Sequence, residues 1–154
     1  MRAPPDEQSV IAANAEFWEQ MLAMTLAPLE PQAEFCLDSR HMLGRVNLSG
    51  NWTGSIEVRL AERLAYEATA AMMAQPVADV GEADTLDAAK EIANMIAGVI
   101  KSSLPRPCSM TVPESEMEPD GYGQPPKSDD SLMVAFHHEA GNLMVRDFEE
   151  ECAQ

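Results

Sequence analysis

Residues 84–104 read "DTLDAAKEIANMIAGVIKSSL", and their apolar side chains recur at the three- and four-residue spacing of one long helix. Asp84 is expected to cap the start of this helix. The stripe expected to face a core consists of Ile92, Met95, Ile96, Val99 and Ile100. An amphipathic helix must bury its apolar side, so this stretch predicts a domain in which helices pack on another layer of secondary structure.

A second line of residues along the same helix has polar side chains and one glycine. It contains Asp87, Glu91, Asn94 and Gly98, with Lys101 near its edge, and it lies well over a right angle from the centre of the apolar stripe. Asparagine competes with the helix backbone for hydrogen bonds, and a mid-helix glycine costs about 1 kcal/mol relative to alanine. Such residues indicate a surface that another helix or a partner approaches closely. Side chains that only solubilise the helix would give the same spacing.

The chain before this helix predicts a helix, a β-hairpin and a further helix. Residues 9–26, "SVIAANAEFWEQMLAMTL", are expected to be helical with Ser9 as the N-cap. The apolar face of this helix would contain Val10, Phe17, Trp18, Met21 and Met24. Residues 43–60 alternate apolar and polar side chains around "SGNWTG", which predicts the hairpin, and residues 61–76 have a helical composition.

Three strands are expected after the long helix. They are "CSMTV" (108–112), "SLMVAFHH" (131–138) and "NLMVRDF" (142–148), and the last two are expected to form a hairpin. Residues 113–130 are rich in proline, glycine and acids, and we expect a mobile surface loop there. This order predicts an α+β fold in which helices pack on an antiparallel sheet.

Length and charge limit the classes of function. The 154 residues suit one domain, for which residues 1–8 and 149–154 are the expected flexible ends. A formal net charge of −16 argues against partners that are nucleic acids or anionic membrane surfaces, because both need a basic face. No apolar run approaches the length of a membrane span, and "MRAPPDEQS" does not resemble a signal peptide, so we expect a cytoplasmic protein.

The cysteines and histidines do not predict a metal site. No CxxC pair is present, and we expect reduced thiols at Cys36, Cys108 and Cys152. His137 and His138 are adjacent on a predicted strand, so their side chains face opposite sides and cannot bind one ion together. His41 could join either, but no carboxylate or thiol spacing completes a ligand set.

A resemblance adds to this interpretation of the residues. "KEIANMIAG" (90–98) resembles the E-x-x-N-x-x-x-G signature of the CheX/CheC/FliY family of chemotaxis phosphatases. Residues 46–73, "VNLSGNWTGSIEVRLAERLAYEATAAMM", look like the glycine-bounded hairpin and following helix of CheX, and the order of elements matches up to Phe148. One E-x-x-N is present, as in CheX, whereas typical CheC proteins carry two.

The resemblance implies a CheC-like fold and a hydrolase that removes phosphate from the phospho-aspartate of a CheY-type response regulator. By the family pattern, Glu91 would bind the regulator's active-site lysine and Asn94 would orient the attacking water. We expect Asp87, Gly98 and Lys101 to contact the same partner. The protein would need no cofactor or metal of its own, because the phosphorylated regulator supplies Mg²⁺. Lys90 departs from the family, which more often has a small residue there.

The resemblance also implies a homodimer, for which residues 142–148 could pair across a two-fold axis as an unprotected terminal strand. Two other functions stay open on the sequence alone. One is a non-catalytic CheX-like module that binds a receiver domain or another signalling partner without hydrolysis. The other is a structural oligomer in which the outward line of the long helix is a contact between identical subunits.

Overall fold

The predicted long helix forms α3, Glu82–Lys101. Its N-terminus is held by the Asp84 carboxylate, which accepts a hydrogen bond of 3.0 Å from the backbone N–H of Gly81. Gly81 is therefore the N-cap, and Asp84 lies three residues inside the helix instead of capping it directly. A negative charge in the first turn also interacts favourably with the helix dipole.

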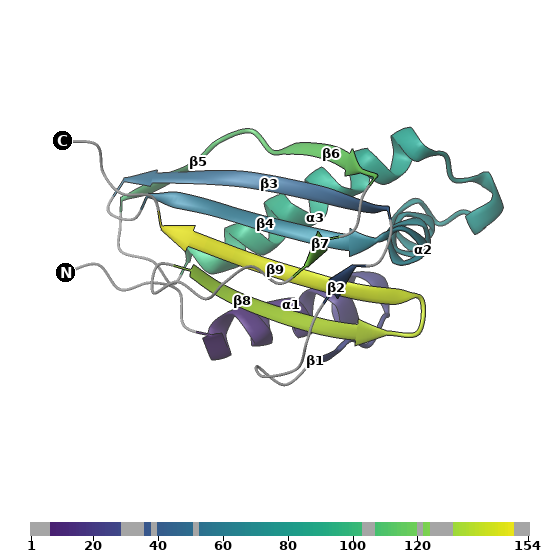
Figure 1. Cartoon of the computed structure of the whole chain (residues 1–154), viewed down its shortest axis with the longest axis horizontal. Coiled ribbons are helices and arrows are strands. Elements are labelled where there is room, and N and C mark those ends of the chain that lie inside the picture. Colours follow the sequence, from purple (N-terminus) through teal and green to yellow (C-terminus); the bar gives the residue numbers. More distant parts are fainter. Residues whose placement is uncertain are drawn as a thin grey trace.

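The computed structural model describes residues 7–28, 36–37, 40–50, 53–102, 107–119, 122–123 and 131–149. In these ranges α1 (Glu7–Leu22) and α3 cross one face of an antiparallel sheet, and α2 (Glu62–Met73) stands at its end (Figure 1). A short 3-10 helix, η1 (Val77–Asp79), joins α2 to α3. The α+β fold expected from the sequence is confirmed.

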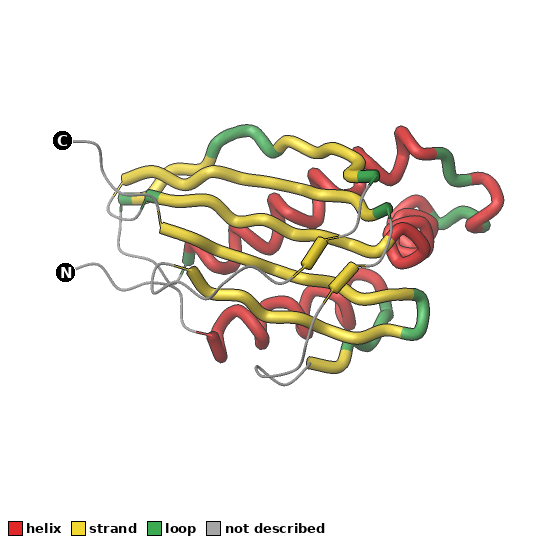
Figure 2. Tube along the Cα trace, in the orientation of Figure 1, coloured by secondary structure: helices red, strands yellow, loops and turns green. Residues whose placement is uncertain are grey.

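The sheet has seven strands, which Figure 2 shows as one yellow layer in front of the red helices. In spatial order they are β1 (Ala27–Pro28), β8 (Ser131–His138), β9 (Gly141–Glu149), β4 (Gly54–Ala61) and β3 (His41–Gly50), followed by β5 (Cys108–Met110) and β6 (Glu114–Glu118), which both pair with β3. Both predicted hairpins, β3–β4 and β8–β9, are present. Two further short strands, β2 (Cys36–Leu37) and β7 (Tyr122–Gly123), pair with each other.

Strand register separates an apolar face from a charged one. In the β3–β4 hairpin, Val46 pairs with Ile56 and both side chains are buried in the core beneath the helices. The neighbouring pair, Arg45 and Glu57, points to the opposite face, because successive side chains alternate along a strand. Trp18 of α1 is among the largest fully buried side chains, so the core lies between this sheet face and the helices.

α3 lies unusually close to β3 because the strand has a glycine beneath it. A Cβ atom added at Gly44 would lie 2.4 Å from the carbonyl oxygen of Ala89 and 2.9 Å from the Cβ of Ala93. A side chain at this position would push the helix away from the sheet. The contact therefore places the small-residue side of α3 against the strand and fixes the rotation of the helix about its axis.

This rotation corrects part of the predicted apolar stripe. Ile92, Ile96 and Ile100 are buried and Met95 packs against the core, as expected, but Val99 is 48% exposed. The centre of the buried face lies instead near the alanines, because Ala89, Ala93 and Ala97 are all buried.

The structure also corrects the N-terminal helix. α1 begins at Glu7, so Ser9 lies within the helix and is not its N-cap. Three of the predicted core residues are buried: Val10, Phe17 and Trp18. Met24 packs partly against the core, but Met21 is 58% exposed. The expected flexible ends are wrong where they overlap α1, at residues 7–8, and β9, at residue 149; their other residues lie outside the described part of the chain.

Two strand predictions were wrong. Residues 113–130 are not entirely loop, because β6 pairs with β3 from Glu118 opposite His41 to Glu114 opposite Arg45. The strand at residues 142–148 is not an edge, since β9 is hydrogen-bonded to β4 on one side and β8 on the other. A dimer formed by pairing along β9 is therefore ruled out.

Among helices in the described ranges, none has the length and apolar composition needed to cross a membrane.

Replacing Gly44 with alanine should destabilise the fold by about 1–3 kcal/mol, because the new methyl group meets the backbone of α3. Urea unfolding measures this loss. The matched control is Gly98→Ala in α3, where an added Cβ meets nothing within 4 Å. This control should raise the free energy of unfolding by about 1 kcal/mol. Equal effects of the two substitutions would contradict the close contact between α3 and β3.

Candidate functional site

The outward line of α3 contains every site residue predicted from the sequence. Asp87 and Glu91 are exposed, whereas Asn94, Gly98 and Lys101 are half-buried. The buried alanines lie on the opposite side of the helix, against the sheet. The contact at Gly44 packs one side of α3 against the sheet and therefore directs this polar line outward. The structure brings all five residues together on one surface.

The carboxylate of Glu91 and the amide of Asn94 are not engaged within the part of the chain that the structure describes. There, neither side chain makes a hydrogen bond or an ion pair. Residues at positions i and i+3 of a helix are neighbours, with Cβ atoms about 5–6 Å apart. The acid and the amide can therefore act together on one group of a partner.

Gly98 leaves room next to this pair. The space around its Cβ position is open, so packing within the subunit does not require a glycine there. Beyond it lies a hollow of about 520 Å³ between the end of α3 and β5. The hollow is lined by Gly98, Lys101, Ser102, Pro107 and Cys108. The outward line thus continues into a concave surface large enough for side chains of a partner.

The chemistry of this surface is limited to binding and orienting. An amide both accepts and donates hydrogen bonds, so Asn94 can hold a water molecule in one orientation. Glu91 can pair with a cation. Among the described residues, no group of three or more His, Cys, Asp or Glu side chains could hold a metal ion.

A family model described as "Chemotaxis phosphatase CheX" matches residues 42–137, a segment that contains the hairpin, α2, α3 and β8 up to His137. The chain belongs to the CheX family. Glu91 and Asn94 fall within the matched segment. No curated protein sequence matches this chain.

Solved structures of CheX and CheC-like proteins share this fold. A CheX chemotaxis protein from Vibrio vulnificus is 20% identical, with a TM-score of 0.71 over 93% of this chain and 95% of that one. A CheC-like superfamily protein from a Shewanella species is also 20% identical, with a TM-score of 0.75 over 94% and 96%. The third is CheX of Borrelia burgdorferi in a CheX–CheY–BeF₃–Mg²⁺ complex, 18% identical, with a TM-score of 0.71 over 96% and 99%.

This CheX family member carries a second polar cluster on the face of the sheet opposite α1 and α3. The sequence analysis did not predict this cluster. His41 is buried, and its Nε2 lies 2.6 Å from Oε1 of Glu118. Arg59 donates from Nε to the same oxygen at 2.9 Å and from a terminal nitrogen to Glu57 Oε1 at 2.8 Å. Arg45 donates to the other oxygen of Glu57 at 2.7 and 3.0 Å. The charges alternating with apolar residues along 41–59 are the signal that could have predicted this network.

The network joins the edge strand β6 to β3 and β4, so its role is structural. The pKa of the Glu118 carboxyl lies below its ordinary value of 4.5. Partial burial acts in the opposite direction, raising the pKa, but hydrogen bonds from Arg59 and His41 favour the charged form and outweigh it. Arg59 stays protonated: burial lowers its pKa, but the Glu57 and Glu118 carboxylates raise it further.

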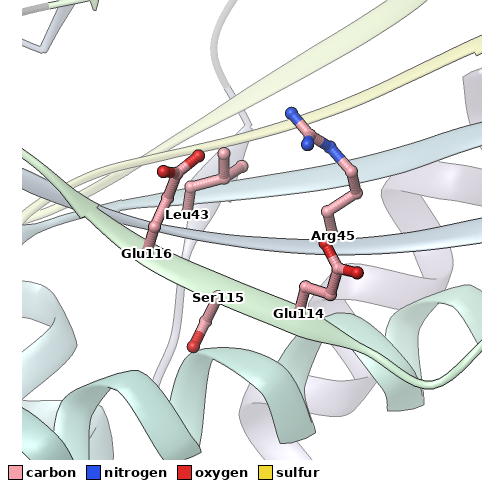
Figure 3. A pocket seen from close by; sticks show the side chains of 5 residues that line it. All are labelled: Leu43, Arg45, Glu114, Ser115 and Glu116. Atoms are coloured by element: carbon pink, nitrogen blue, oxygen red, sulfur yellow. The ribbon is translucent and has the colours of Figure 1, made fainter.

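A small hollow lies next to this network and is not part of the α3 surface. It encloses about 140 Å³ and is lined by Leu43, Arg45, Glu114, Ser115 and Glu116. Figure 3 shows Leu43, Arg45 and Glu116 on one side of the strands and Ser115 on the other, toward a helix. Because Arg45 is already paired with Glu57 and two further acids line the hollow, an anionic group would not be attracted there.

The lowered pKa of Glu118 predicts how stability depends on pH. Its carboxylate contributes stability fully above its unfolded pKa, near 4.5, and the contribution disappears as pH falls through the lower folded value. The free energy of unfolding of Glu118→Gln should therefore fall less steeply than that of the wild type as pH decreases from about 5 to 3. The control is Glu116→Gln, an exposed position on the same strand. Parallel pH curves for Glu118→Gln and the wild type would contradict this assignment.

Proposed function

We propose that this chain hydrolyses the phospho-aspartate of a CheY-type receiver domain, with Asn94 orienting water and Glu91 docking the receiver. The observation that carries the proposal is the acid–amide pair on the outward side of α3, which makes no hydrogen bond or ion pair with any residue that the structure describes. Membership of a family of chemotaxis phosphatases supports the reaction, and the CheX–CheY complex of Borrelia burgdorferi supports the class of partner.

The reaction needs little from the phosphatase because an aspartyl phosphate is an activated acyl phosphate. The oxygen of a water molecule attacks phosphorus, the bond between phosphorus and the aspartyl oxygen breaks, and the aspartate leaves as a carboxylate. The water proton passes to the released phosphate. What the receiver lacks is a water held in line with the breaking bond, and positioning alone lowers such a barrier considerably. Mg²⁺ enters with the substrate, bound to the receiver.

Asn94 would supply this positioning. Its Oδ1 can accept a hydrogen bond from the attacking water while its NH₂ group donates one to the water or the phosphoryl group. The glutamine of GTPases orients an attacking water in the same manner. Because the amide lies in the middle of a long helix, its position relative to a docked partner is well defined.

Glu91 would fix the docking one helical turn away, through an ion pair with the receiver's active-site lysine, as the family resemblance implies. Asp87 and Lys101 extend the contact along the same side of α3. Gly98 would allow the receiver to approach the helix backbone, since no side chain of the described residues lies within 4 Å of its Cβ position.

Phosphate loss from a phosphorylated receiver, measured with and without the protein, tests this function. Asn94→Ala should remove the acceleration, by a factor of about 100 or more, while binding stays within about threefold of wild type. Glu91→Ala should weaken both binding and hydrolysis, because it removes the docking charge. The receivers of the source organism would be screened to find the substrate.

Three outcomes contradict the proposal in different ways. Binding without accelerated phosphate loss would favour a non-catalytic CheX-like module. Absence of binding to any receiver, together with burial of the α3 line between subunits, would favour a structural oligomer. Acceleration that survives Asn94→Ala would place the chemistry elsewhere. Asp79→Ala is a control outside the α3 line and should change neither binding nor hydrolysis.

A homodimer remains a prediction from the family resemblance, and β9 cannot form its interface. Sedimentation velocity at micromolar concentration should give about twice the 16.8 kDa mass of the chain. A species of one chain mass would contradict the dimer without affecting the assignment of Asn94 and Glu91.

A further inference from the structure

Two lysines on α3 have no ionic partner among the described residues, unlike four arginines of the same part of the chain. Four arginines form ion pairs with glutamates: Arg40, Arg45, Arg59 and Arg63. Within the described ranges, Lys90 and Lys101 make no ion pair, although Asp87 lies only one turn from Lys90. In a chain of net charge −16, two cations on one helix that form no ion pair with the described residues are unexpected.

The two lysines lie on one line, on either side of the acid–amide pair. They are eleven residues apart, which is about three helical turns and roughly 16 Å along the axis. Glu91, Asn94 and Gly98 lie between them. Lys90 is exposed at one end of this line, and Lys101 lines the hollow at the other. A partner centred on Asn94 therefore meets a positive charge on each side.

We infer that Lys90 and Lys101 form a cationic docking line for the acidic rim of the phosphorylated receiver. This inference rests on the proposed function. The rim of such a receiver carries a phosphoryl dianion and the carboxylates that hold its Mg²⁺, so its local charge is complementary to the two ammonium groups. The net charge of this chain would repel an acidic partner, and the two lysines supply local attraction where the surfaces meet.

The lysines act on association and not on bond cleavage. Exposed charges steer diffusional encounter and chiefly change the association rate constant, whereas groups that touch the reacting atoms change the rate in the bound complex. The attraction is screened over about 10 Å at 0.1 M salt. The association rate constant should therefore fall as salt increases, even though the two proteins have no general electrostatic attraction.

The test uses the full chain and the receiver that the phosphate-release screen identifies, loaded with BeF₃⁻ and Mg²⁺. Stopped-flow mixing measures the association rate constant at several salt concentrations for wild type, Lys90→Gln, Lys101→Gln and the double variant. Lys90→Arg/Lys101→Arg keeps the charge. Arg63→Gln on α2 makes the same change in net charge as either single glutamine variant, on an exposed residue away from the α3 line.

The double glutamine variant should associate about tenfold more slowly than wild type at low salt, and the difference should largely disappear near 0.5 M salt. Phosphate loss at saturating protein should fall by a smaller factor than the association rate constant does, and the arginine variant should keep the wild-type association rate. If Lys90→Gln and Lys101→Gln each match Arg63→Gln in association rate and salt dependence while wild type still removes the phosphate from the receiver, this inference fails alone. If wild type neither binds nor dephosphorylates any receiver, both the inference and the proposed function fail.

Discussion

The contact between α3 and Gly44 of β3 determines how the rest of this surface is arranged. An added Cβ at Gly44 would meet the carbonyl oxygen of Ala89 at 2.4 Å, so the helix can lie this close only above a glycine. The same contact turns the alanine side of α3 into the core. Glu91 and Asn94, on the opposite side, are thereby directed outward, and within the described residues neither makes a hydrogen bond or an ion pair.

Much of this arrangement could be predicted from the sequence, because the period of α3 is strong and its polar line is continuous. The exact rotation of α3 about its axis could not be predicted in this way. Isoleucines and valines dominate a hydropathy pattern, whereas alanines contribute little to it. The approach of Ala89 and Ala93 to a glycine in a strand about 45 residues earlier is a tertiary effect, and it leaves Val99 exposed.

The strands show the same limit of prediction from local sequence. The sequence "ESEME" of β6 is predominantly acidic and resembles a surface loop, yet its alternation suits an edge strand with Glu118 bound to Arg59 and His41. Its position near the end of the sequence predicts an edge for the strand at residues 142–148, but the β8–β9 hairpin places β9 next to β4 within the sheet. Local patterns predict that a strand exists, and long-range pairing determines where it lies.

Charge is distributed differently on the two sides of the molecule. On the far face of the sheet, Glu57 and Arg59 neutralise each other in a buried network that holds the edge strand. On the outward line of α3, Asp87, Glu91, Asn94 and Lys101 lack such partners within the described chain. The first arrangement stabilises the fold, and the second leaves groups available to another protein, which is the physical basis of the function proposed for this CheX family member.

The central claim is that one side of α3 packs closely against the sheet, so that the other side can approach a phosphorylated receiver. Phosphate release by Gly98→Leu tests it most directly, because an added Cβ at this position meets nothing within 4 Å among the described residues. The account predicts a free energy of unfolding no lower than that of wild type and at least about a tenfold loss of phosphatase activity. A stable Gly98→Leu protein that dephosphorylates the receiver at the wild-type rate would contradict it.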